Sequence, residues 1–227
     1  MLPEIIIDKR ITAICPNLKI GVIRANVVNS ETSDELWGEI EREAESIKQQ
    51  YELLEINKRP AIAQTRILYK TLGKDPNRYR VASEALCRRV IKGLGLYRID
   101  TLVDLINLVS MKTGYAISGL DGDKIEGNSL AMGIGKEGED YHGIGRGVLN
   151  ISGLPVYRDA IGGVATPTSD EERTKITVDT RTLQMNINGF GPEFPMDNAV
   201  KWSVELLCKY ACATNIETKI MGISDFV

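Results

Sequence analysis

The stretch RIDTLVDLINLVSMKTGYAISGLDGDKI, residues 98–125, predicts a helix followed by a strand. Residues 100–112 carry apolar side chains on nearly every side, which is typical of a central, buried helix. Gly114 is the expected end of this helix, and the apolar run Ala116–Leu120 then predicts a short strand. The chain therefore combines both kinds of element around one predicted core helix.

Two polar side chains, Asp104 and Asn107, interrupt the apolar surface of this helix. Buried polar groups need hydrogen-bond partners, because a group left without one destabilises the fold. The pair therefore indicates either a structural hydrogen-bond network or a binding site, and the pattern leaves both open.

The residues before this stretch predict helices, because apolar side chains recur there every three or four residues. Thr32 and Glu35 form a capping box at the start of the first helix, and Ser83 is the expected N-cap of the last. The predicted helices are residues 32–51, 60–72 and 84–92.

The residues after Gly114 predict strands, because short apolar segments alternate there with glycine-rich turns. These segments are Ala116–Leu120, Leu130–Ile134, Pro155–Ala160 and Leu183–Ile187. The GxGxG run at residues 143–147 lacks the helix that a dinucleotide-binding loop requires, so it predicts a hairpin instead.

Together these elements predict an α+β fold with one domain over residues 1–227. We expect a helical part over about residues 1–114, a strand-rich part over about 115–195 with a mixed or antiparallel sheet, and a closing helix over about 196–214.

The composition is that of an ordinary globular protein, with 227 residues of which 43% are hydrophobic and 26% charged. No apolar run approaches the ~20 residues of a membrane-spanning helix. The first ten residues lack the basic-then-apolar order of a signal peptide. The sequence therefore predicts a cytoplasmic protein without a membrane partner.

Histidine and cysteine usage argues against several kinds of catalytic site. His142 is the only histidine, so neither a zinc site nor a histidine-based catalytic triad is expected. The four cysteines, at positions 15, 87, 208 and 212, form no CxxC pair and are expected to be buried thiols. We expect neither a metal nor a cofactor.

Basic residues are concentrated in one segment. Residues 58–98 carry eleven Lys or Arg side chains against only Asp75 and Glu84, a net charge of +9, although the whole chain has a net charge of −3. Such a segment is typical of a surface that binds phosphates, or of a solvated face that pairs with acidic parts of the fold. The candidate RNA-binding residues are Arg80, Arg88, Arg89 and Lys92, although Glu84 and Arg88 are also spaced for an intrahelical ion pair. The aromatic side chains nearby are Tyr69, Tyr79 and Tyr97.

Residues 98–126 resemble the editing module, or B-three/B-four domain, of the phenylalanyl-tRNA synthetase beta subunit. The family pattern reads N-N-V-V-D-x-T-N-x-V and then G-Q-P-L-H-A-F-D-x-D-K-I. It aligns without gaps with Asp104, Asn107, Gly114 and the run from Asp121 to Ile125. The flanks are similar to freestanding relatives of that module, so the resemblance covers roughly residues 60–190.

This resemblance implies an α+β domain that binds tRNA or aminoacyl-tRNA, and it implies hydrolysis of a misacylated tRNA in trans as the candidate activity. The catalytic core of the synthetase itself is absent. Asn107 aligns with the pocket asparagine of the family. The chain departs from the pattern at Ser118, which replaces the pocket histidine, and at Val164, which replaces a pocket glutamate of many bacterial enzymes.

The expected ligand pocket combines these positions with the glycine pair and the polar loop that follow. Glycine pairs let backbone N–H groups approach a ligand closely, and acidic and arginine side chains can bind an amino group or a carboxylate. The candidate pocket residues are Asn107, Ser118, Asp121, Gly162, Gly163, Val164, Ser169, Asp170, Arg173 and Thr174. The catalytic group remains unassigned.

The alternative is a non-catalytic module that binds a free amino acid or a similar small ligand. The missing histidine and glutamate and the low aromatic content favour this hypothesis. A structural role in a larger translation complex is also compatible with the sequence.

Overall fold

Helix α5 (Thr101–Thr113) lies at the centre of the computed structural model, which describes residues 1–191 and 195–226. The Asp100 side chain accepts a hydrogen bond from the backbone N–H of Val103 and so caps the start of the helix. Gly114 ends it in the left-handed conformation, with φ of 80°. Most side chains of α5 are buried, so the prediction of a central helix is confirmed.

A four-stranded antiparallel sheet packs against α5 and against α6 (Met196–Ala211). In spatial order its strands are β10 (Thr214–Gly222), β2 (Lys19–Asn26), β9 (Thr182–Gly189) and β3 (Ala116–Asp121). Two glycines allow the helices to come this close. A Cβ atom at Gly119 would lie 2.4 Å from Cδ1 of Ile106, and one at Gly21 would lie 2.6 Å from Cγ2 of Val200.

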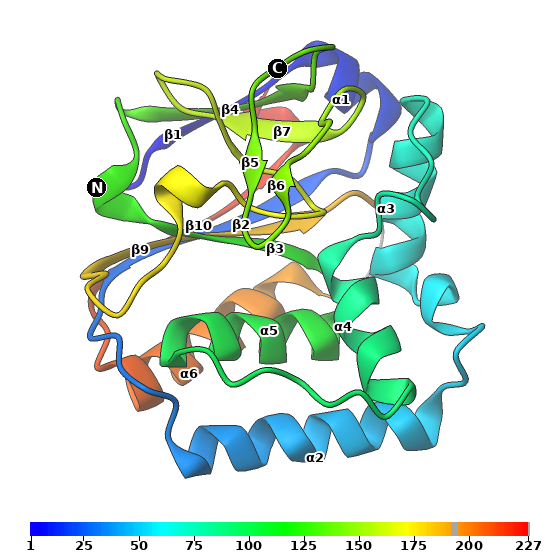
Figure 1. Ribbon diagram of the computed structural model, residues 1–227. Coiled ribbons are helices and arrows are strands. Elements are labelled where there is room, and N and C mark those ends of the chain that lie inside the picture. The colour runs from blue at the N-terminus through cyan, green and yellow to red at the C-terminus, as the bar shows by residue number, and fades with distance from the viewer. Residues whose placement is uncertain (192–194, 227) are drawn as a thin grey trace.

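A second sheet covers the other face of this central sheet, as Figure 1 shows. In spatial order its strands are β1 (Glu4–Ile7), β4 (Ser129–Ile134), β7 (Pro155–Arg158) and β8 (Gly163–Ala165). Strands β1 and β4 are parallel, whereas the other pairs are antiparallel. Side chains of both sheets meet in a second hydrophobic core that includes Val22, Leu120, Leu130 and Met132.

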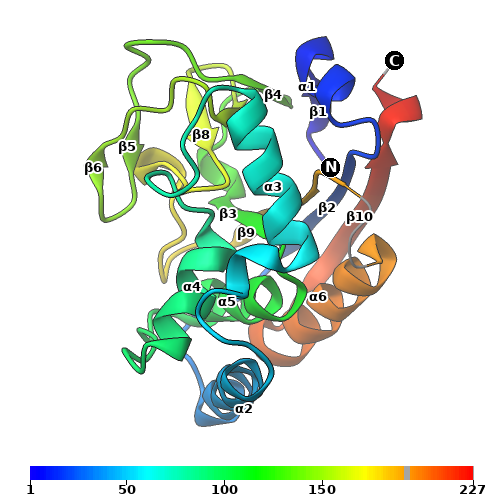
Figure 2. The same cartoon turned by 90° about the vertical axis from the view of Figure 1, so that its right-hand side faces the viewer.

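The remaining helices surround α5 and the sheets. Helix α2 lies on the side of α5 away from the central sheet in Figure 1, and α3 stands alongside α4 and the sheets in Figure 2. The α-helices not yet given are α1 (Lys9–Ile14), α2 (Asp34–Gln50), α3 (Pro60–Thr71) and α4 (Ala82–Ile91). Short 3-10 helices occupy Ile56–Lys58, Gly122–Lys124, Glu172–Thr174 and Ile223–Asp225.

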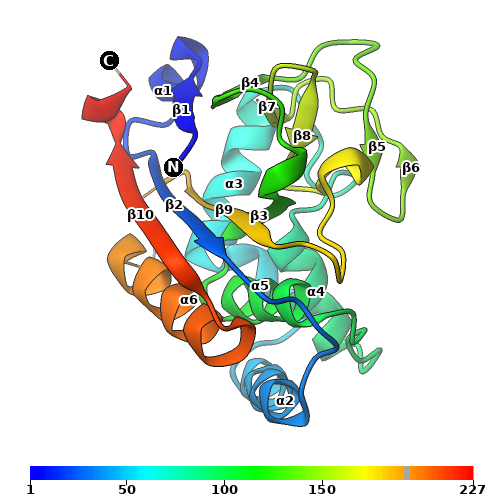
Figure 3. The same cartoon turned by 90° about the vertical axis from the view of Figure 1, so that its left-hand side faces the viewer.

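The predicted α+β class is confirmed, and so is the hairpin, which pairs β5 (His142–Gly143) with β6 (Gly147–Val148). Helices lie mainly in the N-terminal half, as predicted, but the strands are not confined to the second half. Strands β1 and β2 come from the part expected to be helical, and β10 follows the helix expected to close the chain, as Figure 3 shows at the sheet edge. The sequence of β2 does not alternate between apolar and polar residues, because residues on both faces of this strand are buried.

Two predicted helix caps are also corrected. Ser33, not Thr32, caps α2, because its side chain accepts a hydrogen bond from the N–H of Leu36. The Thr32 hydroxyl instead donates to Oδ2 of the buried Asp104 over 2.5 Å. Asp104 thus belongs to a structural hydrogen-bond network. Ser83 lies inside α4 and is fully buried rather than capping it.

The expectation of four buried thiols holds for Cys15 and Cys87 but is wrong for Cys208 and Cys212, which are exposed. These two lie on the outer side of α6 and at its end, where the helix has only one face to bury. Among the described residues no helix combines the length and the apolar character needed to cross a lipid bilayer.

Candidate nucleic-acid interface

A groove of about 450 Å³ lies over α4, bounded by the segment that follows α4 and by the tip of the β5–β6 hairpin. Five of its lining side chains are cationic, and none of the described residues that line it is acidic. We call it the basic groove. Its lining residues are Arg80, Ala82, Ala85, Leu86, Arg88, Arg89, Lys92, Leu94, Tyr97, Asn107 and Arg146. All four predicted RNA-binding residues are therefore brought together.

Helix α4 brings Arg88 and Arg89 to the groove together, although adjacent helical residues point about 100° apart. Arg88 reaches back to donate to the carbonyl oxygen of Leu53 over 3.1 Å. Arg89 donates to the carbonyl oxygens of Gly95 and Leu94 over 2.6 and 3.2 Å. Both side chains are half-buried, and each keeps further N–H groups for a ligand.

The segment after α4 presents an aromatic ring at the groove. Gly93 and Gly95 adopt φ of 68° and 65°, which lets the chain turn sharply past the helix end. Tyr97 follows with 69% of its surface exposed, and the Arg89 guanidinium carbon lies 4.2 Å from its ring centroid. By contrast Tyr69 is fully buried, and Nζ of Lys74 lies 3.7 Å from the ring centroid of Tyr79.

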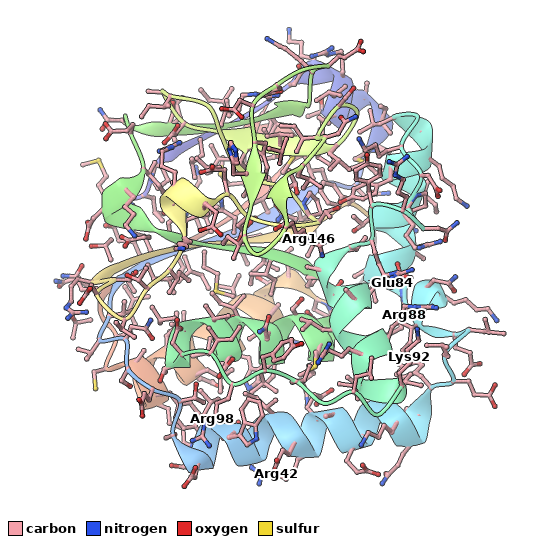
Figure 4. The ribbon with its side chains drawn as sticks, in the orientation of Figure 1. Arg42, Glu84, Arg88, Lys92, Arg98 and Arg146 are labelled. Atoms are coloured by element: carbon pink, nitrogen blue, oxygen red, sulfur yellow. The ribbon has the colours of Figure 1, made fainter. Side chains whose placement is uncertain are left out.

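Arg146 is the groove cation that the sequence analysis missed. It lies at the hairpin tip, where Figure 4 places it opposite α4 with its labelled side chains Glu84, Arg88 and Lys92. The hairpin is held by a hydrogen bond from the N–H of Ile144 to the Asp170 carbonyl oxygen, 3.0 Å long. An arginine between two glycines of a predicted hairpin was the available signal, because such a tip exposes its one long side chain.

Behind the hairpin, polar side chains fill part of the space between the two sheets. We call them the buried polar cluster, which consists of the buried Ser118, Tyr157, Gln184, Asn186 and Asn188 and the half-buried residue Asp170. Oδ2 of Asp170 accepts a hydrogen bond from the N–H of Gly119 over 3.1 Å, and Ser118 bonds to the same carboxyl. Burial nevertheless raises the pKa of Asp170 to about 7, because desolvation opposes ionisation.

The cluster is closed rather than open to a ligand. Ser118 is only 2% exposed and stands opposite Asn186 in the sheet register. Gln184 donates to Oδ1 of Asn186 over 2.8 Å, which leaves the Gln184 carbonyl oxygen and the Asn186 amide nitrogen without partners. None of the cluster's side chains lines the basic groove.

Comparison with known proteins assigns the chain to a family. The model of the B3/4 domain matches residues 64–203, more than half of the chain. The chain belongs to the B3/4 domain family. No curated protein matches the sequence.

This B3/4 domain also resembles a solved structure, an N-terminal fragment of the phenylalanyl-tRNA synthetase beta subunit from Pyrococcus horikoshii. The two chains share 12% sequence identity with a TM-score of 0.46. The match covers 97% of this chain and 52% of the other, so this chain spans about half the length of that fragment.

The structure separates the residues expected to form one ligand pocket. Asn107 is the one that lines the basic groove, from α5. Ser118 and Asp170 belong to the buried polar cluster. Ser169 adjoins it, and its carbonyl oxygen accepts a 2.7 Å hydrogen bond from the Tyr141 hydroxyl.

The glycine pair and Arg173 of this B3/4 domain are engaged within the protein. The Gly162 N–H and both terminal nitrogens of Arg173 donate to the carboxylate of Asp159. Burial alone would raise the pKa of Asp159, but these hydrogen bonds and others from backbone N–H groups lower it. A Cβ atom at Gly163 would lie 2.8 Å from the Tyr141 ring, so this glycine makes room for a core side chain.

The last three predicted pocket residues are structural in their contacts. Asp121 accepts a hydrogen bond from the Thr180 hydroxyl over 2.9 Å and pairs with Lys124 over 3.2 Å. Val164 is fully buried in β8, and Thr174 is fully buried with its hydroxyl unpartnered. Within the described residues, no three His, Cys, Asp or Glu side chains gather as a metal site would require.

Proposed function

We propose that this B3/4 domain binds RNA through the basic groove, with tRNA or aminoacyl-tRNA as its ligand. The observation that carries the proposal is the convergence of five cationic side chains on one groove, with no acidic side chain among its described lining residues. Phosphate groups bind such surfaces by displacing condensed counterions, and arginine forks suit their oxygen atoms. The motif resemblance at residues 98–126 supports tRNA as the class of RNA.

Tyr97 supports an RNA ligand over a simple polyanion. Its exposed ring and the adjacent Arg89 guanidinium offer a surface on which a base can stack. Its apolar neighbour in the groove, Leu94, is 60% exposed. The phosphates of the same strand would then contact the arginines along α4 and Arg146 on the hairpin.

The test is a titration of fluorescently labelled tRNA at several salt concentrations. The double charge reversal Arg89→Glu with Arg146→Glu should weaken binding about 100-fold and flatten the dependence of log Kd on log salt, because phosphate contacts are lost. The matched control reverses two exposed lysines outside the groove, Lys9→Glu with Lys201→Glu, and changes the net charge equally. Equal weakening by both pairs would reject the groove as the binding site.

Hydrolysis of an aminoacyl ester is the second candidate function, favoured by the half-buried Asn107 at the groove. An amide at this place can position the ester, whose bond is already activated. Incubation with a panel of correctly and incorrectly charged tRNAs should show selective loss of one ester, and Asn107→Ala should abolish it. If no ester is lost, the domain binds tRNA without cleaving it.

The basic groove disfavours the alternative of a free amino acid as ligand. An amino acid carries an α-ammonium group, which binds best to an anionic acceptor, whereas every charged side chain among the described lining residues is cationic and only neutral acceptors such as the Asn107 amide oxygen face it. Thermal melting in the presence of each amino acid should therefore leave the melting temperature unchanged. A concentration-dependent rise with one of them would instead support the small-ligand function.

A further inference from the structure

We infer that Glu84 is a positioning residue of the basic groove: its buried carboxylate holds Arg80 and Arg88 in the arrangement that meets phosphate. The inference rests on the proposed function for its consequence, weaker RNA binding, but its geometric part concerns this chain alone. Glu84 lies behind the groove on α4, and it is not among the residues that line it. It would act on RNA only through the arginines.

Three guanidinium groups meet at this one carboxylate, which is 2% exposed. Oε2 lies 2.8 Å from Nη1 of Arg66, a buried arginine of α3. Oε1 lies 3.6 Å from Nε of Arg80 and 3.9 Å from Nη1 of Arg88. Arg88 follows Glu84 by four residues on α4, so this pairing follows from helical spacing, whereas Arg80 lies before the helix begins at Ala82.

The two groove arginines have few other anchors. Nε of Arg80 is buried without a hydrogen-bond partner, and the Glu84 carboxylate lies within ion-pair distance of it. The terminal nitrogen Nη2 of Arg80 makes one 3.4 Å contact, to the carbonyl oxygen of Asn77. Arg88 has its 3.1 Å hydrogen bond to Leu53. Arg66, in contrast, is also held by Pro76 and Asn77.

Charge repulsion explains why the Glu84 carboxylate lies beneath a groove that is proposed to bind phosphate. Two guanidinium groups that share one acceptor repel each other, and without that acceptor they would move apart into solvent. If Glu84 acted only through its charge, removal of that negative charge beside the groove would strengthen RNA binding. If Glu84 positions the arginines, its removal weakens RNA binding, because the arginines must then be ordered at the moment of binding.

Two variants separate these effects, and a third serves as a control. Glu84→Asp preserves the charge and withdraws the carboxylate by one methylene group, so it suits a site where loss of the charge could unfold the domain. Glu84→Gln removes the charge and keeps the length. Glu52→Gln removes an exposed charge from the segment that precedes Leu53, and Glu52 is not among the residues that line the groove.

The experiment first measures the arginines in the absence of RNA. Nuclear magnetic relaxation of the Nε–H groups, assigned with Arg80→Lys and Arg88→Lys, should show both groups ordered in the parent protein. Both should become mobile in Glu84→Asp and Glu84→Gln, while Glu52→Gln leaves them ordered. Unchanged order in the Glu84 variants, with the fold verified by circular dichroism, would overturn the inference.

The second measurement is tRNA affinity on the same samples. Glu84→Asp should weaken binding about fivefold, because charge-assisted contacts depend on geometry. Its effect should be smaller in an Arg88→Ala background and absent when Arg80→Ala is added, since Glu84 would act through these two arginines. Full additivity there, or tighter binding by Glu84→Gln, would contradict positioning. Mobile arginines in the variants of a protein that binds no tRNA would refute the proposed function and leave the geometric role established.

Discussion

The basic groove and the buried polar cluster both contain side chains that the sequence marks as a site, yet they differ in what can reach them. Groove side chains such as Arg89 and Tyr97 are half-buried or exposed and have spare hydrogen-bonding groups or an open ring face. Cluster side chains such as Ser118 and Asn186 are buried, and they bond mainly to one another. This difference shows that positions which a family pattern marks as a pocket can lie buried in the core of a particular chain.

From this contrast we expect mutations in the two regions to affect different properties of the protein. Changes in the buried polar cluster should alter the free energy of unfolding and leave RNA affinity unchanged. Changes in the basic groove should do the reverse.

The largest effect is expected for Asp170→Asn in the cluster. The folded-state pKa of Asp170 is about 7, above its ordinary 3.8, so the folded protein favours the protonated form. Its contribution to stability is full below pH 4 and is lost as the pH rises to 7, by roughly 4 kcal/mol. Urea unfolding from pH 4 to 8 should show this fall for the parent and not for Asp170→Asn. If the free energy of unfolding changed equally with pH in the parent and in Asp170→Asn, Asp170 would not have this raised pKa.

A smaller loss is expected for Tyr157→Phe in the same cluster. The Tyr157 hydroxyl donates a 2.7 Å hydrogen bond to Oδ1 of Asn188, and both side chains are buried. Its removal leaves the Asn188 oxygen unsatisfied and should lower the free energy of unfolding by about 2 kcal/mol. Urea unfolding measures the loss, and tRNA titration should show unchanged affinity. Weaker tRNA binding by this variant would show that the buried polar cluster also contributes to RNA affinity.

In the groove, Tyr97→Ala should weaken tRNA binding about tenfold, since base stacking contributes about 1–3 kcal/mol. Tyr97→Phe keeps the aromatic face and should bind like the parent. Because Tyr97 is 69% exposed, neither change should lower the unfolding temperature appreciably. Anisotropy titrations and melting curves check both statements. Equal affinity for the alanine and phenylalanine variants would show that no base stacks there.

The smallest effect is expected for Lys92→Ala. Lys92 is an exposed cation at the groove margin, so its removal should weaken tRNA binding about threefold and reduce the salt slope by roughly one. The unfolding free energy should stay within about 0.5 kcal/mol of the parent. Lys201→Ala on α6 is the matched control and should change neither quantity. An unchanged slope for Lys92→Ala would place the phosphates elsewhere.

Local patterns in the sequence were enough to predict the units that depend on neighbouring residues. The cap at Gly114, the apolar surface of α5 and the strand β3 could be read directly, because side chains three or four residues apart set a helix face and glycine permits its end. The four basic residues at positions 80 to 92 were found for the same reason, since one helix and the residues beside it carry them.

The tertiary structure decided which distant residues meet. Arg146 joins the groove because a hairpin anchored on Asp170 folds over α4, and Ser118 and Val164 are buried because a second sheet covers the first. Strand β10 pairs with β2, although the two strands lie near opposite ends of the sequence. Such contacts form only when the gain in buried surface exceeds the entropy of closing long loops, and no local pattern records that balance.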